Sequence, residues 1–159
     1  MGWTVLVLIP KGTTDTRVIG LLDTLWKVVE ELIETRLRAS LQFHDVLHGF
    51  LATIGTGTAI MDLDLAQYLA IVDQDPLFMF FLGLWKSYNT VDRERLIQTL
   101  EGYGARPRMC GFLETVWYHQ QVVLTHNGCH SLAFLATQGT THGGLVSPTL
   151  FNVVVDNVI

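Results

Sequence analysis

The chain has 159 residues, about the length of one domain, with a formal net charge of −5 at pH 7 and a pI of about 5.6. Hydrophobic residues make up 49% and charged residues only 16% of the sequence, whereas soluble domains average roughly 25% charged residues. The acidic balance argues against a self-sufficient nucleic-acid binder, which would usually be basic. The low charge predicts exposed apolar surface, through which copies could associate or partner segments could dock.

No segment of the sequence is typical of a membrane protein. The apolar run at residues 76–85 is much shorter than the roughly 20 residues that cross a bilayer. The N-terminus lacks the basic start and the cleavage site of a signal peptide. Two cysteines, Cys110 and Cys129, are too few for a disulfide framework. We therefore expect a cytoplasmic protein without a membrane partner.

The first half of the chain predicts one strand and two helices. Residues 4–9 are typical of a short strand, and residues 11–17 form a polar turn. Leucine, valine and isoleucine then recur at helical spacing from Leu21 to Leu37. A second helix is expected over residues 59–72, with Thr58 as its N-cap.

A buried strand and two further helices are expected next. The run from Phe78 to Leu84 is typical of a buried strand, and a helix follows over residues 92–100. Gly102 stands where a C-terminal cap belongs. The Arg106-Pro107 break precedes a helix that we expect to run to about Gln120.

The last part predicts a hairpin and a final helix. Strands at residues 122–124 and 132–136 flank Asn127-Gly128, the strongest hairpin signal in the chain. Ser147-Pro148 opens a helix, with serine as N-cap and proline at the first helical position. Helices with scattered strands indicate the α+β class.

Five stretches in this order resemble the reverse transcriptases of the group II intron and retron kind. They are IPKGTTDTRVIGLL, LHGFLATIGTGTAI, FFLGLWKSYNTVDRERL, QVVLTHNGCHSLAFLATQGTTHGG and GGLVSPTLFNVVVD. The resemblance implies an incomplete right-hand polymerase, with fingers at residues 1–75 and part of the palm at 76–159. A fingers hairpin would be inserted at about residues 120–137.

The resemblance also shows that the chain lacks the residues that bind metal in this family. Nucleotidyl transfer uses two Mg²⁺ ions held by carboxylate oxygens. In the family, one aspartate comes from the first palm motif, where this sequence has Gly83, and two come from a Tyr-x-Asp-Asp motif that these 159 residues do not contain. Mg²⁺ is the family's cofactor, and we expect this chain alone not to bind it.

Other positions have changed in the apolar direction. Leu51 and Ile54 stand where the family has arginines, and Trp85 where it is commonly polar or basic. Asn89 replaces an aspartate, and His142 replaces the glutamine before the paired glycines. These changes fit drift without selection for catalysis.

Several nucleotide-binding positions of the family are kept. Lys11 and Arg17 match the residues that hold the incoming triphosphate, although both could be solvated loop charges. Tyr88 resembles the aromatic gate against the ribose 2′-hydroxyl, or is an ordinary half-buried tyrosine. His142, Gly143 and Gly144 match the loop that approaches template or nucleotide. Alternatively, the two glycines form a plain turn before a helix.

A zinc site is a weaker interpretation of the hairpin. His126, Cys129 and His130 lie at one hairpin tip without a second ligand pair. We interpret them as a chance cluster and predict no metal ligands in this chain.

The sequence therefore predicts a reverse transcriptase fragment, inactive by itself, from a retroelement whose polymerase uses an RNA template, a DNA primer and deoxynucleotides. The alternative is a non-catalytic module derived from such an enzyme, which binds RNA or docks a partner chain.

Overall fold

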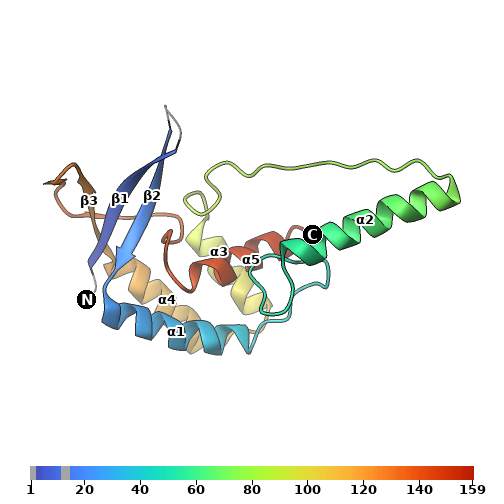
Figure 1. The fold of residues 1–159 in the computed structure, drawn as a ribbon. Helices are drawn as coiled ribbons and strands as arrows, with labels where there is room; N and C mark the ends of the chain where they lie inside the picture. Colours follow the sequence, from blue (N-terminus) through green and yellow to red (C-terminus); the bar gives the residue numbers. More distant parts are fainter. Residues whose placement is uncertain (1–2, 12–14) are drawn as a thin grey trace. The chain divides into compact units, whose positions relative to one another are not determined.

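The structure is a computed structural model that describes residues 3–11 and 15–159. Figure 1 shows strands and helices mixed along the chain, which agrees with the predicted α+β class. The strands are β1 (Trp3–Lys11), β2 (Asp15–Leu22), β3 (Gln121–His126), β4 (Cys129–His130) and β5 (Phe134–Leu135). The helices are α1 (Thr24–Arg38), α2 (Thr56–Asp73), α3 (Arg93–Gly102), α4 (Pro107–His119) and α5 (Ser147–Asp156).

The strands form one mixed sheet in the order β2-β1-β3-β4, and β5 also pairs with β3. β1 and β2 are an antiparallel hairpin, with Leu6 opposite Gly20. β1 and β3 are parallel, with Thr4 opposite Val122. Parallel neighbours need a long crossover connection, and here it runs from β2 through α1, α2, α3 and α4. The sheet thus brings the start of the chain beside its last third.

One face of the sheet is buried. Side chains alternate between the two faces of a strand, so Thr4 on β1 shares a face with Leu22 on β2 and Val122 on β3. All three are buried. On the opposite face, Ile9 and Leu21 are 43% and 53% exposed.

The main core lies among the helices. Leu96 and Leu100 on α3, Leu113 on α4, and Leu150 and Val153 on α5 are buried. Each fully buried side chain of this kind contributes roughly 1.5–3 kcal/mol relative to an exposed one. α1 adds Ile33 and Leu37 to the buried residues.

The chain divides into two compact units. The first unit comprises Met1–Gln42 and Lys86–Ile159, and the second comprises Phe43–Trp85. All ten lysines and arginines belong to the first unit, together with ten of the fifteen acidic residues. The first unit is therefore formally neutral, and the net charge of −5 resides entirely in five aspartates of the second unit.

The second unit exposes most of its apolar residues. None of the residues of α2 is buried, although the helix is rich in leucine and isoleucine. The segment at residues 77–85 is likewise exposed, with Phe80 at 87% and Leu82 at 90%. The sequence prediction of exposed apolar surface is confirmed, and most of it lies here. No helix in the described ranges is both long and apolar enough to cross a bilayer.

The predicted strand at Phe78–Leu84 is wrong. Residues 75–84 carry no helix or strand and are exposed throughout. A strand requires a neighbour to accept and donate its backbone hydrogen bonds, and no described strand pairs with this run. The strand predicted at residues 132–136 is reduced to Phe134–Leu135 for the same reason, because only these two residues pair with β3.

The sequence also misplaced the start of the first helix. β2, which the sequence did not predict, continues to Leu22, and α1 begins at Thr24 after the N-cap Asp23. Leu21 and Leu22 fit a strand as well as a helix, and pairing with β1 decides between them. The turn predicted at residues 11–17 is shorter than expected, since Lys11 and Asp15–Arg17 belong to strands. Its remaining residues, 12–14, lie outside the described residues.

Three predicted caps are displaced. Gly55 precedes α2 in place of Thr58, whose hydroxyl instead accepts the Gly55 N–H at 2.9 Å. Gly102 lies inside α3, and Gly104 adopts the left-handed φ of +84° beyond it. Ser147 is the first residue of α5, and its hydroxyl donates to the Thr141 carbonyl at 2.8 Å. Each helix exists, but its cap lies one to three residues away.

Candidate nucleotide-binding site

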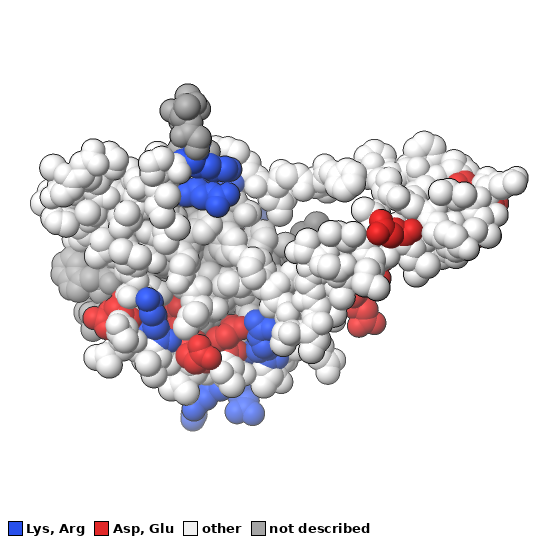
Figure 2. Space-filling view, in the orientation of Figure 1, with Lys and Arg blue, Asp and Glu red and all other residues white. Residues whose placement is uncertain are grey.

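The β1–β2 hairpin carries two exposed cations on one face. Lys11 pairs with Asp15 and Ile9 pairs with Arg17 in the hairpin register, so Lys11 and Arg17 point to the same side. They are the basic residues of these two strands. Figure 2 shows basic atoms gathered at the outer end of the hairpin. Two adjacent cations on an exposed face suit the oxygens of a phosphate.

The loop that holds His142 and Gly143 runs along the edge of β2. The Gly20 N–H donates to the His142 carbonyl at 2.6 Å. Gly143 has a φ of +100°, and a Cβ added there would lie 2.6 Å from the Gly20 carbonyl oxygen. Only glycine fits this position without strain. The two glycines therefore do more than form a plain turn, because Gly143 packs directly against β2, the strand that carries Arg17.

Tyr88 and His142 come together in the first unit, and the charge of Arg17 acts on His142. Burial lowers the pKa of His142 below its ordinary value of 6.5, and the positive charge of Arg17 lowers it further. The Tyr88 ring lies 4.6 Å from the His142 ring, between centroids, and stacks on Phe151 at 4.9 Å. Burial raises the pKa of the Tyr88 phenol. Tyr88, His142 and Phe151, which are far apart in sequence, thus form one aromatic cluster, and Arg17 affects it through its charge.

Glu30 on α1 anchors the same loop, and the sequence interpretation missed it. Its carboxylate accepts the Leu145 N–H at 2.6 Å and the Trp26 indole N–H at 3.1 Å. The same oxygens lie 3.2 and 3.3 Å from the position of a Cβ added at Gly144. Desolvation by burial raises the pKa of Glu30, and these hydrogen bonds oppose the rise. No local pattern could reveal this contact, because its partners are 115 residues apart.

Arg93 holds the segment before the loop and was also missed. Its guanidinium donates to the Gly139 carbonyl at 2.8 Å and to the Ala136 carbonyl at 2.6 Å. It also lies over the Trp117 ring, 5.3 Å from the centroid. The Thr140 N–H then donates to the Tyr88 carbonyl at 2.8 Å. These bonds fix the distance between Tyr88 and the His142 loop.

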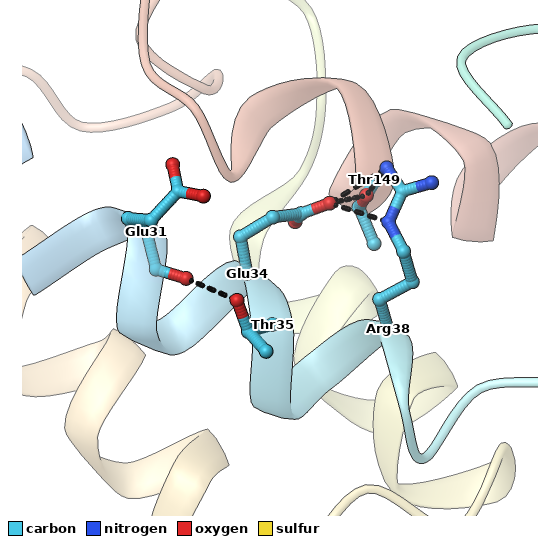
Figure 3. A network of polar contacts seen from close by, with 5 residues as sticks. All are labelled: Glu31, Glu34, Thr35, Arg38 and Thr149. Atoms are coloured by element: carbon cyan, nitrogen blue, oxygen red, sulfur yellow. Dashed lines mark hydrogen bonds and ion pairs between the residues drawn. The ribbon is translucent and has the colours of Figure 1, made fainter. Parts of the chain in front are cut away.

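A polar network ties α5, which follows the loop, to α1. Glu34 Oε1 accepts from the Thr149 hydroxyl at 2.7 Å and from Arg38 Nε at 2.8 Å. Arg38 Nη2 also reaches the Thr149 hydroxyl at 3.2 Å. Figure 3 shows these three side chains converging between the two helices, whereas Glu31 and Thr35 bond only along α1 in this view. The loop is therefore held at both ends.

The residues present do not fit the Mg²⁺ ions of the family. Gly83 lies in the exposed segment of the second unit, and nothing stands within 4 Å of a Cβ added there. Within residues 3–11 and 15–159, no three His, Cys, Asp or Glu side chains are placed to hold one ion. The hairpin tip contributes no such group: His130 Nδ1 lies 2.9 Å from the Thr125 hydroxyl, and Cys129 is an exposed free thiol.

Of the predicted site residues, Tyr88 contacts His142, and Gly143 follows His142 in the loop that packs against β2. Gly144 is buried beside them against Glu30, and Lys11 shares the hairpin face of Arg17. Gly83 belongs to the second unit. The arrangement offers two exposed cations, a pair of stacked aromatic rings and a closely fitted glycine loop, without a carboxylate side chain at position 83.

Comparison with known proteins matches residues 9–159 to the family "Reverse transcriptase (RNA-dependent DNA polymerase)". Over 158 residues the chain is 25% identical to the "Retrovirus-related Pol polyprotein from type-2 retrotransposable element R2DM" of Drosophila melanogaster. It is 26% identical over 161 residues to the "Transposon TX1 uncharacterized 149 kDa protein" of Xenopus laevis. Each alignment covers 96% of this chain but only 15% and 12% of these relatives. The chain belongs to the reverse transcriptase family and represents part of its polymerase domain.

Proposed function

We propose that this chain keeps a nucleotide- and template-facing surface of a reverse transcriptase and does not catalyse nucleotidyl transfer by itself. The contact between the Tyr88 and His142 rings, together with the charge of Arg17 acting on His142, carries the proposal. These are positions that the family resemblance associates with the triphosphate, the sugar and the template. Gly83 carries the second half, because a glycine has no side-chain carboxylate to bind a metal ion.

The charge distribution supports binding of RNA by the first unit. The net charge of −5 would oppose a polyanion if it were spread evenly over the chain. Instead, the acidic excess lies in the second unit, and the first unit is neutral, with two of its ten cations, Lys11 and Arg17, on the hairpin. Binding would therefore be weak, local and sensitive to salt.

Assignment of residues 1–75 to fingers and 76–159 to palm remains part of this proposal, as does the hairpin insertion. The origin in a group II intron or retron also remains a prediction, whereas the relatives reported above are retrotransposon proteins. Cytoplasmic location and a DNA primer as partner are predictions on the same footing.

Primer extension and RNA binding, measured in the same reactions, test the proposal. With Mg²⁺, an RNA template, a DNA primer and deoxynucleotides, we expect retention of the RNA at low salt and no extension above the protein-free level. An Arg17→Gln variant should retain less RNA than an Arg95→Gln variant, because Arg95 is 85% exposed on α3, away from the cluster. Extension by the purified chain would disprove inactivity, and failure to retain RNA would disprove the binding surface.

A second candidate function is docking of another chain or self-association. The exposed apolar side chains of α2 and residues 77–85 favour it. Light scattering over a range of protein concentrations should then show growing particles, and charged substitutions at Phe80 and Leu82 should suppress them. Particles of constant size would remove this candidate.

A further inference from the structure

A pocket of about 230 Å³ lies beside the cluster, in the first unit. The sheet supplies Thr4, Leu6, Val18 and Val122 to its wall, and Arg93, Gln120, Ala136 and residues 138–142 add to it. Asn89 and Gln138 also line it and are exposed, so the pocket opens to solvent beside them. His142 is the only residue that the pocket shares with the predicted site residues.

Three residues of the pocket wall carry buried polar atoms without a partner. These atoms are Gln120 Oε1, Thr140 Oγ1 and His142 Nδ1. Thr140 is only 5% exposed. Gln120 meanwhile donates from Nε2 to the Thr4 and Thr141 hydroxyls at 3.0 and 2.9 Å, which leaves its carbonyl oxygen as an acceptor. A buried polar atom that lacks a partner costs about 1–3 kcal/mol, so three on one wall point to a ligand that satisfies them.

The chemistry of the wall selects a neutral ligand with N–H donors. Gln120 Oε1 accepts hydrogen bonds only, so it cannot bond a fully ionised phosphate or a carboxylate. Two of the Arg93 N–H groups are already bonded to backbone carbonyls. The remaining wall combines aliphatic side chains with the amides of Asn89 and Gln138.

A nucleobase has these properties. Its two faces are apolar enough to lie against Leu6, Val18 and Val122, and its edge offers the donors and acceptors that amide side chains bind. The pocket would hold roughly seven waters at about 30 Å³ each, which is room for one heterocycle. Unpaired bases of single-stranded RNA are read in this way, by edge contacts in a pocket.

We propose that this pocket binds one unpaired nucleobase. The base could belong to a free nucleoside or to single-stranded RNA, and only the second source rests on the proposed function. Asn89 and Gln138 at the mouth contact the base first, and Thr140 and Gln120 bond its edge inside.

The experiment compares a short single-stranded oligoribonucleotide with the same backbone carrying abasic sites, at equal salt and phosphate number. We expect the base-bearing strand to bind the unchanged chain at least tenfold more tightly. Free nucleosides should compete for the pocket at higher concentration, whereas ribose 5-phosphate should not. Equal affinity for the two strands, with no nucleoside binding, would overturn the proposal and leave water as the content of the pocket.

Two variants, Val18→Trp and Thr140→Val, and one control, Ile9→Trp, test whether the preference for the base-bearing strand depends on this pocket. Val18→Trp places a large side chain on the pocket face of β2 and should abolish the preference for the base-bearing strand. Ile9→Trp places the same ring on the opposite, exposed face of the sheet and should leave the preference unchanged. An unchanged preference in Val18→Trp would overturn the assignment to this pocket.

Thr140→Val keeps the side-chain shape and removes one unpartnered hydroxyl. We expect a three- to tenfold loss of the preference for bases, together with a melting temperature that is unchanged or higher. A merely structural threonine would instead lower the melting temperature and leave the preference intact, which would count against the proposal.

The outcomes separate the pocket from the proposed function. Equal retention of the base-bearing and abasic strands would support the proposed function and overturn the assignment of the pocket to a nucleobase. Nucleoside binding without RNA retention would support the pocket and contradict the proposed function.

Discussion

The two units of the chain treat their apolar residues in opposite ways. In the first unit, α3, α4 and α5 bury leucine and valine completely, and their polar contacts hold a glycine loop in place. In the second unit, α2 has no buried residue, and residues 77–85 expose phenylalanine and leucine. The family match spans both units. The sequence similarity thus includes the second unit, whose apolar side chains are exposed in this structure instead of buried.

The division into two units also separates the proposed nucleotide-binding residues from position 83. The first unit holds all the lysines and arginines and the aromatic cluster of Tyr88 and His142, whereas the second unit holds Gly83 and the whole acidic excess. We propose that Gly83 stands in place of a carboxylate; it is exposed, and nothing lies within 4 Å of a Cβ added there. A substitution at this position need not disturb the first unit, so the proposed binding surface does not depend on a carboxylate at position 83.

Core truncation should show the largest contrast between the units. Leu100→Ala removes a completely buried side chain on α3 and should lower the free energy of unfolding by about 3 kcal/mol. Ile71→Ala on α2 removes a side chain that is 76% exposed and should change it by less than about 0.5 kcal/mol. Urea unfolding measures both. Equal losses would mean that α2 is packed in solution and would break the comparison.

Alanine at two glycines should have effects of opposite sign. Gly143→Ala forces a Cβ to within 2.6 Å of the Gly20 carbonyl oxygen at a φ of +100° and should cost about 1–3 kcal/mol. Gly111→Ala on α4 meets nothing within 4 Å and should stabilise the chain by about 1 kcal/mol, because alanine favours helix. Thermal unfolding of the two variants gives the signs. Tolerance of alanine at Gly143 would contradict the tight fit of the loop.

Removal of the Thr149 hydroxyl should have a smaller effect. Thr149→Val deletes a bond to the Glu34 carboxylate at a site that is 1% exposed and should cost about 1–2 kcal/mol. Thr35→Val removes an exposed bond to the Glu31 carbonyl within α1 and should cost less than about 0.5 kcal/mol. Urea unfolding distinguishes them, and equal costs would show that the network does not join α1 to α5.

Titration of His142 should give the smallest effect on stability. Burial and Arg17 hold its folded pKa below 6.5, so the unfolded chain takes up the proton first as the pH falls. The stability that His142 contributes is therefore full above pH 6.5 and is lost as the pH falls from 6.5 through the folded pKa. In Arg17→Gln the folded pKa should rise, as followed by the imidazole proton resonances. An unchanged pKa would place Arg17 away from the cluster.

Local patterns in the sequence were enough to predict most helices and the Asn127-Gly128 turn. Asn127 and Gly128 adopt the positive φ values, 49° and 77°, that this hairpin turn requires. α4 ends at His119, next to the predicted end at Gln120. These features depend on residues that are close in sequence, so composition and spacing contain the necessary information.

Features that depend on distant partners were missed or misplaced. β2 is a strand because it pairs with β1. The run at residues 78–84 is not a strand, because no described strand pairs with it. The bond from Glu30 to Leu145 spans 115 residues, and the carbonyl bonds of Arg93 span 43 and 46. The site residues Arg17, Tyr88 and His142 were named through the family resemblance, and spacing alone could not have placed them together.

The central claim is that Arg17, Tyr88 and His142 still form one triphosphate-facing site. The most direct measurement follows the His142 imidazole resonance and its pKa during titration with a deoxynucleoside triphosphate, without metal. A triphosphate bound at Arg17 would offset its positive charge, so we predict a saturable shift and a rise in the His142 pKa, both absent in Arg17→Gln. If the triphosphate changes neither the resonance nor the pKa, the cluster is not a nucleotide site.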